Sequence, residues 1–547
     1  MLKLKTFLAC VLTFTLPIAA AENPPADPQA KPAVSEIEQL KQMLADQQRQ
    51  IDELKKQLGM PRNAHASIGE VASTAAILPP AAPVATAAPV FTSTAVAAPV
   101  PAQTAKSESA PTTFRIGDAY ITPVGFMDFT SVTRSTNPGS GIGTNFGSVP
   151  YSNVQGGNLT EWRLSPQNSR LGVRIDAMVK GTKVLGYWES DFLGQTGNPP
   201  NGGLAVSSNP YPFRMRLYWV DLTKDKFELL AGQTWSLLTP NRKGVSPLPG
   251  DLFYSQDIDV NYQAGLVWGR IPEIRFAYHP NKQVAFAVAL SNSEPYVGGG
   301  NGGGAITPPT ALAGVLGSQI NNGTSVISSA ALHPDIIAKL AFDPTSRFHF
   351  ELAGVEITNK IANPATNPAF KTFTKAGFGG SANLNFEVVK NFRLITNNFW
   401  SDGGGRYIFG QAPDFVLRSD GSISPVHSAS TVTGFEAVAG KTMFYGYYGG
   451  VYISRNTAID TNGSRIGYGF TGSANSQNRA IQEATFGTNT TIWKDAKYGA
   501  LNLMFQYSYL QRNPWFVASG ALSDAHVHMG FFNLRYTLPG SAPTLGK

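Results

Sequence analysis

The sequence is almost free of cysteine. Its one cysteine is Cys10, so the chain beyond the N-terminal segment has neither disulfide bonds nor thiol chemistry. Charged residues are also scarce, at 14% of the 547 residues, against roughly 25% in typical soluble proteins. With 11% aromatic residues and a mean hydropathy of −0.10, this composition argues against a cytosolic enzyme. It favours a chain in which apolar residues alternate with small polar ones.

Two kinds of motif are absent as well. No run of roughly 18 apolar residues follows the N-terminal segment, so no transmembrane helix is expected. The chain has no zinc-protease, nucleophile-elbow or P-loop pattern, and we expect no enzymatic activity, no cofactor and no metal site.

The formal net charge is +7, which in an exported chain favours small anionic solutes over nucleic acid as partners.

The N-terminus has the layout of a secretory signal peptide. Lys3 and Lys5 give it a positive start, residues 7–18 are mostly apolar, and residues 19–21 are three alanines that suit a cleavage site. We therefore predict a signal peptide over residues 1–21 and a short linker over residues 22–33.

Residues 34–60 show the heptad repeat of a coiled-coil oligomerisation helix. The a and d positions of about three heptads are Ile37, Leu40, Leu44, Gln47, Ile51, Leu54 and Leu58. Gly59 and Pro61 end the helix. So narrow a stripe favours self-association over the alternative of a monomeric amphipathic helix. The number of helices stays open, with a trimer permitted.

Residues 61–112 are rich in alanine and proline, poor in charge and without periodicity. This composition is typical of a flexible linker. We predict that it tethers the helix to the rest of the chain.

Residues 113–547 consist of short stretches in which apolar and polar residues alternate. Their connections fall into two classes, tight turns such as 180–182 and 280–282, and long segments rich in Gly, Asn, Ser and Pro. Tight turns at one end and long loops at the other are typical of a transmembrane β-barrel. We predict an all-β, antiparallel barrel of sixteen strands, near 119–131, 169–179, 183–193, 212–222, 226–235, 261–279, 283–292, 334–343, 346–357, 374–388, 391–401, 431–439, 442–455, 479–494, 497–511 and 526–538. Pro272 interrupts the sixth strand, so eighteen strands are the alternative.

The two faces of these strands differ, as insertion into a membrane requires. In the predicted strand 212–222, the expected lipid face holds Phe213, Met215, Leu217 and Trp219, and the expected lumen face holds Arg214, Arg216 and Tyr218. Apolar and polar residues also alternate in the strands of a soluble β-sandwich, but the connections of a sandwich do not fall into two length classes.

Arginines occupy strand positions opposite the apolar face. The candidate pore residues on strands are Arg170, Arg174, Arg214, Arg216, Arg275, Arg393 and Arg535. A guanidinium group presents a rigid fork that suits carboxylate and phosphate groups, so a ladder of arginines makes a path for anions. The alternative is that inward acids, such as Glu189 and Asp191, neutralise them.

A long loop over residues 236–260 carries both signs of charge. Arg242 and Lys243 lie near its start, and Asp251, Asp257 and Asp259 lie near its end. If this loop folds into the lumen, cations facing acids would make a transverse field across a constriction. The sequence does not decide whether the loop turns inward.

This organisation resembles the DcaP-like trimeric outer-membrane porins. The likeness rests on the coiled coil, the Ala/Pro linker, the arginine-bearing barrel, and the stretches AYITPVGFMDFTSV and NSRLGVRID. It implies a homotrimer in the bacterial outer membrane, with the N-terminal segment in the periplasm, and uptake of small anionic solutes such as dicarboxylates.

Two classes of function stay open at this point. One is a diffusion channel, either anion-preferring or general. The other is a mainly structural anchor in the outer membrane, whose helix holds barrels in register or reaches a periplasmic partner.

Overall fold

The computed structural model describes residues 113–194, 211–253, 255–299, 303–321 and 330–539, together with Gln42 and Arg49. The chain divides into two units, Met1–Ala102 and Gln103–Lys547. The predicted signal peptide, both linkers and the seven seam residues of the predicted helix lie outside the described residues. Gln42 and Arg49, which fall within the predicted helix 34–60, are helical.

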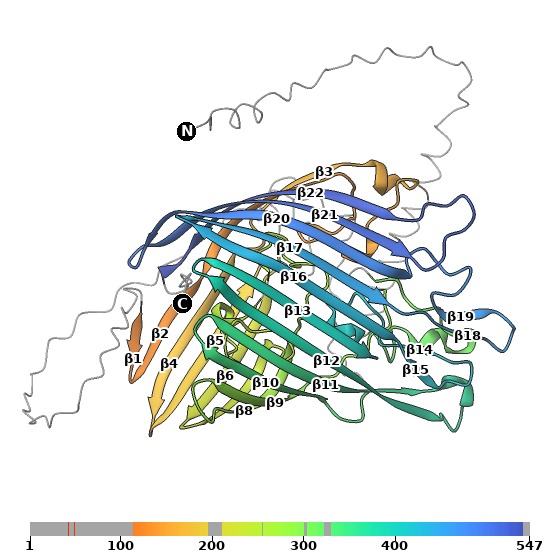
Figure 1. Cartoon of the computed structure of the whole chain (residues 1–547). Coiled ribbons are helices and arrows are strands. Elements are labelled where there is room, and N and C mark those ends of the chain that lie inside the picture. The colour runs from red at the N-terminus through yellow and green to blue at the C-terminus, as the bar shows by residue number, and fades with distance from the viewer. Residues whose placement is uncertain are drawn as a thin grey trace, which may run out of the picture. The chain divides into compact units, whose positions relative to one another are not determined.

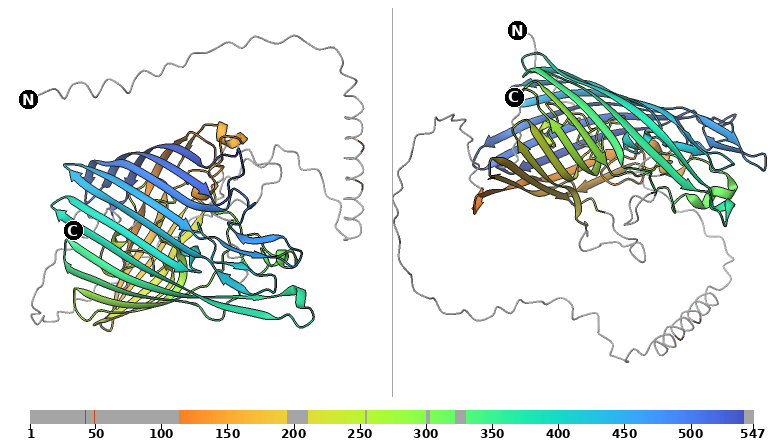
Figure 2. Two further views of the ribbon diagram at one scale, coloured as in Figure 1. Left: turned by 45° about the vertical axis from the view of Figure 1, so that its right-hand side comes forward. Right: turned by 90° about the horizontal axis from the view of Figure 1, so that it is seen from below.

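A closed barrel of sixteen antiparallel strands forms the second unit (Figures 1 and 2). The strands are β2 (Ala119–Arg134), β4 (Arg170–Val179), β5 (Thr182–Asp191), β6 (Arg214–Lys224), β7 (Phe227–Trp235), β8 (Arg270–Tyr278), β9 (Val284–Ser291), β10 (Asp335–Thr345), β11 (Phe348–Ala362), β12 (Thr372–Val389), β13 (Phe392–Asp402), β16 (His427–Ala439), β17 (Thr442–Ile453), β20 (Asn478–Asp495), β21 (Gly499–Pro514) and β22 (Ala525–Thr537). Each pairs with the next, and β22 closes the wall by pairing with β2, where Phe126 lies opposite Thr537. The predicted sixteen-stranded fold is confirmed.

Two short strands extend this sheet without adding to the wall. β3 (Glu161–Ser165) pairs with the second half of β2, and β4 pairs with the first half. β3 therefore continues the line of β4 along β2. β1 (Phe114–Ile116) pairs with the start of β2.

The connections sort into the two predicted classes. Lys180 and Gly181 join β4 to β5, and both have positive φ angles, 48° and 80°, as a two-residue hairpin turn requires. The longer connections carry the hairpins β14 (Phe415–Leu417) with β15 (Ile423–Pro425) and β18 (Asn456–Ile459) with β19 (Arg465–Tyr468). Figure 1 shows both hairpins at the same end of the barrel.

The helical elements of the described barrel are six short 3-10 turns. They are η1 (Phe146–Ser148), η2 (Gln155–Asn158), η4 (Pro249–Asp251), η5 (Thr310–Val315), η6 (Pro364–Thr366) and η7 (Gly405–Tyr407). No helix among the described residues is long and apolar enough to cross a membrane.

In strand β6, part of the predicted assignment of residues to the lipid face and the lumen face is wrong. Met215 points outward as predicted, but a β-bulge follows, because the register shifts between Ser190↔Met215 and Glu189↔Leu217. Beyond the bulge the alternation is inverted. Leu217 and Trp219, predicted on the lipid face, are buried inside the barrel, and Tyr218, predicted in the lumen, is 62% exposed on the outside.

Strand β8 is shorter than the predicted strand 261–279. It begins at Arg270, and residues 261–269 belong instead to the preceding loop, which spans residues 236–269. Tyr262, Leu266 and Trp268 of this loop are buried against Leu217 and Trp219 of the inner wall. The apolar core thus lies inside the barrel, between the wall and the loop.

Candidate functional site: the barrel lumen

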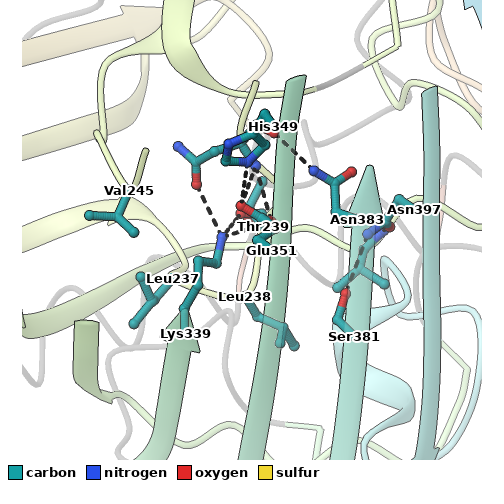
Figure 3. Close-up of polar contacts among 12 residues, drawn as sticks. Leu237, Leu238, Thr239, Val245, Lys339, His349, Glu351, Ser381, Asn383 and Asn397 are labelled. Atoms are coloured by element: carbon teal, nitrogen blue, oxygen red, sulfur yellow. Dashed lines mark hydrogen bonds and ion pairs between the residues drawn. The ribbon is translucent and has the colours of Figure 1, made fainter. Parts of the chain in front are cut away.

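The loop 236–269 lies inside the barrel and contacts well-separated strands of its wall. Near its start, Asn241 donates its backbone N–H to Glu351 of β11 at 3.2 Å, a contact region shown in Figure 3. Further along, the Ala264 N–H donates to Glu483 of β20 at 2.8 Å. The loop therefore crosses the lumen and narrows it.

Apolar burial and one glycine allow this loop to pack against the inner wall of the barrel. Leu252, Phe253 and Leu266 are at most 3% exposed, so their burial supplies the favourable free energy for folding inward. On β17, Gly449 leaves room for the loop backbone, because a Cβ atom there would lie 1.9 Å from the Ala264 carbonyl oxygen.

A second inward segment packs on the first. Arg406, in the connection between β13 and β16, donates to Asp414 at 2.9 Å and to Asp335 of β10 at 3.2 Å. Burial raises the pKa of Asp414 to about 6, against the opposing effect of Arg406. Phe409 stacks on Trp268 with ring centroids 4.5 Å apart. The sequence reasoning did not single out this segment.

The predicted arginines of β4 and β6 surround two acids of β5. Arg216 donates to Glu189 and to Asp191, each at 2.7 Å. Arg214 holds Asp191 with two bonds of 2.9 and 2.6 Å, and Arg170 lies 3.6 Å from Glu189. The structure brings together these three predicted pore residues and the acids expected as their alternative partners.

The other predicted strand arginines lie apart from this cluster and also have polar partners. Their contacts are Arg174 to Asp176 at 2.7 and 2.8 Å, Arg275 to Glu273 at 2.9 and 2.5 Å, Arg393 to Asn385 at 2.8 Å, and Arg535 to Asp128 at 2.8 Å. All seven predicted strand arginines are thus ion-paired or hydrogen-bonded to a neighbouring side chain.

In three pairs, the cation lies nearer to solvent than the acid. The Arg214 side chain is 36% exposed and that of Asp191 0%. Arg535 is 25% exposed and Asp128 0%, while Arg242 is 20% exposed and Glu436 7%. These pairs turn their positive ends toward the water inside the barrel.

The charges of the loop have partners of different kinds. Arg242 forms two bonds, of 2.8 and 2.6 Å, with Glu436 of β16, and Lys243 is exposed. Asp251 is half-buried. Asp259 is 1% exposed and accepts the N–H groups of Thr144 and Asn261.

Asp257 is held within the loop, where it accepts a hydrogen bond from Ser255 at 3.2 Å. Burial raises the pKa of Asp257 and of Asp259, and the charge of Asp259 raises that of Asp257 further. Neither of these two acids has a bond to Arg242 among the described residues.

Several acids that complete the site were missed by the sequence reasoning. Glu273 lies two positions from Arg275 on the same strand, a spacing that places both side chains on one face and could have revealed it. Asp128 meets Arg535 across the barrel closure. Nothing local in the sequence marks that pair.

Comparison with solved structures identifies proteins that share this fold. No family model and no curated protein matches the sequence. Among solved structures, the outer membrane channel DcaP of Acinetobacter baumannii superposes with a TM-score of 0.56 at 16% identity, over 78% of this chain and 99% of that one. An anion-selective porin from Comamonas acidovorans gives a TM-score of 0.42 at 12% identity, over 77% and 100%. Salmonella typhi OmpF gives 0.41 at 9%, over 78% and 100%. The chain shares the fold of the DcaP channel.

Proposed function

We propose that this protein is a diffusion channel of the bacterial outer membrane that passes small anions in preference to cations. The observation that carries the proposal is the exposure difference within the ion pairs. At Arg214, Arg535 and Arg242 the guanidinium group contacts the lumen, and its carboxylate partner lies behind it. An anion in the lumen therefore approaches the cation first.

The same pairing keeps the interaction moderate. An isolated guanidinium group would hold an anion tightly, whereas one that already donates to a carboxylate offers only its remaining N–H groups. Conduction needs several sites of moderate strength in series, because a single tight site would retain the solute. Partly exposed cations on β4, β6, β13, β22 and the loop provide such a series.

Small dicarboxylates are the solute class that we favour. A di-acid spans two neighbouring cations, so it releases one while it still contacts the other. The resemblance to the DcaP-like porins supports this choice, and it supports a homotrimer with the N-terminal segment in the periplasm. General diffusion and a structural anchor are the alternative functions.

Measurement of the reversal potential in planar bilayers with a KCl gradient tests the proposal. We expect the sign that corresponds to chloride preference, with a smaller effect at high salt because the charges are screened. A cation-selective channel would refute anion preference. Equal uptake of neutral sugars and succinate into liposomes would favour general diffusion, and absence of conductance would favour the anchor.

A further inference from the structure

A buried histidine lies between the two wall acids that hold the start of the loop 236–269. His349 of β11 is 3% exposed. Its Nδ1 lies 2.9 Å from Asp343 Oδ1, and its Nε2 lies 3.1 Å from Glu351 Oε2. Figure 3 shows His349 and Glu351 beside Lys339 and Thr239.

The same two carboxylates hold the loop backbone. Asp343 accepts the N–H of Gly244 at 3.0 Å, and Glu351 accepts the N–H of Asn241 at 3.2 Å. Segment 239–245, which carries Arg242 and Lys243, is therefore attached through the two acids that His349 bridges.

This arrangement needs one proton more than a neutral imidazole and two ionised carboxylates hold. An ionised carboxylate only accepts hydrogen bonds, and a neutral imidazole donates from one nitrogen alone. Both contacts of His349 therefore require the imidazolium, or the same proton on one of the two acids. Loss of that proton breaks one contact and leaves two carboxylates facing a neutral ring.

The other charged groups around the cluster are already engaged. Lys339 of β10 donates to Glu351 at 3.0 Å and to the Thr239 carbonyl oxygen at 2.8 Å. The Arg275–Glu273 pair of β8 acts on Lys339 at longer range. Lys339 therefore offsets one of the two acids, and the imidazolium offsets the other.

We propose that His349 is a positioning residue of the channel, whose protonated ring latches segment 239–245 to the wall and so keeps Arg242 and Lys243 in the lumen. Loss of the proton loosens the segment. The consequence for conduction rests on the proposed function, whereas the latch itself does not.

A spin label at position 243 tests the latch directly. The full chain with Lys243→Cys is labelled with a nitroxide after reconstitution, because the one native cysteine, Cys10, lies in the predicted signal peptide. We expect an immobile label at acidic and neutral pH that becomes mobile, reversibly, as the pH is raised. With His349→Gln the label should be mobile at every pH.

Two further variants complete the test. His279→Gln is the matched control, because His279 contacts Glu228 at 3.0 Å at the end of β8 and should leave the titration unchanged. In Asp343→Asn, the side-chain amide can donate a hydrogen bond to a neutral His349 ring. The label in this variant should therefore stay immobile at every pH. The proposal would be overturned if label mobility changed with pH in His349→Gln or in Asp343→Asn as it does in the Lys243→Cys chain alone. It would also be overturned if label mobility in the Lys243→Cys chain alone did not change with pH. A cation-selective wild type would overturn the proposed function alone.

Discussion

At the scale of single residues, exposure decides which arginines act on a solute. Arg174 and Arg214 are about equally exposed to the lumen, at 34% and 36% of their side chains. Arg216 and Arg275 are buried at 2% and 3%. We infer that the first two contribute to selectivity and that the second two stabilise the wall.

Replacement of both exposed arginines tests this division. Arg174→Gln with Arg214→Gln should move the reversal potential toward zero while total conductance changes less. The reason is that Asp191 keeps Arg216 as a partner, while the positive charge at the lumen surface is lost. The matched control is Lys224→Gln with Lys441→Gln, which removes the same charge at two tight turns. Selectivity equal in the arginine variant and the wild type would contradict the assignment.

The buried pairs predict an effect on stability instead. Glu273, whose side chain is 0% exposed, accepts bonds from Arg275 and from Ser291. Glu273→Gln leaves the Arg275 charge buried without its acid, which should cost about 3–5 kcal/mol of unfolding free energy. Asp176→Asn, in a pair that is one-third exposed, should cost about 1 kcal/mol or less. Urea unfolding in lipid vesicles measures both, and equal losses would argue against a buried-charge effect.

At the scale of elements, the packing of the loop 236–269 on the wall depends on a close contact between the loop backbone and Gly449 of β17. Gly449→Ala should push residues 263–266 off the wall, because the added Cβ would overlap the Ala264 carbonyl oxygen. We expect a changed single-channel conductance and more frequent transitions between levels.

The neighbouring glycine provides the control for this variant. A Cβ at Gly450 would meet its nearest atoms at 3.7 Å, an ordinary contact, so Gly450→Ala should conduct like the wild type. A normal single-channel record for Gly449→Ala would show that the loop does not depend on this contact.

At the scale of the whole molecule, the barrel closes without the N-terminal segment. The closing pair joins β2, which begins at Ala119, to β22, and both lie after the predicted linker. Deletion of residues 22–112 should therefore leave a conducting barrel whose migration in gels still changes on heating.

The same deletion should weaken the oligomer if the predicted coiled coil holds the barrels together. Native electrophoresis in mild detergent, at several protein concentrations, compares the deletion with the full chain. An unchanged oligomer would show that the barrel surfaces suffice for assembly, and loss of conductance in an inserted barrel would contradict the tether model.

The sequence by itself determined the strand count, most strand positions and the sorting of the connections by length. These features follow from period-two alternation and turn chemistry, which act over a few residues. Only the tertiary structure decided the inverted faces of β6, because one extra residue in a bulge changes every later position. It also decided that residues 236–269 fold inward and that Arg535 meets Asp128 and Arg242 meets Glu436. Those contacts depend on strand register and on closure of the wall, which join residues 407 and 194 positions apart and leave no local mark in the chain.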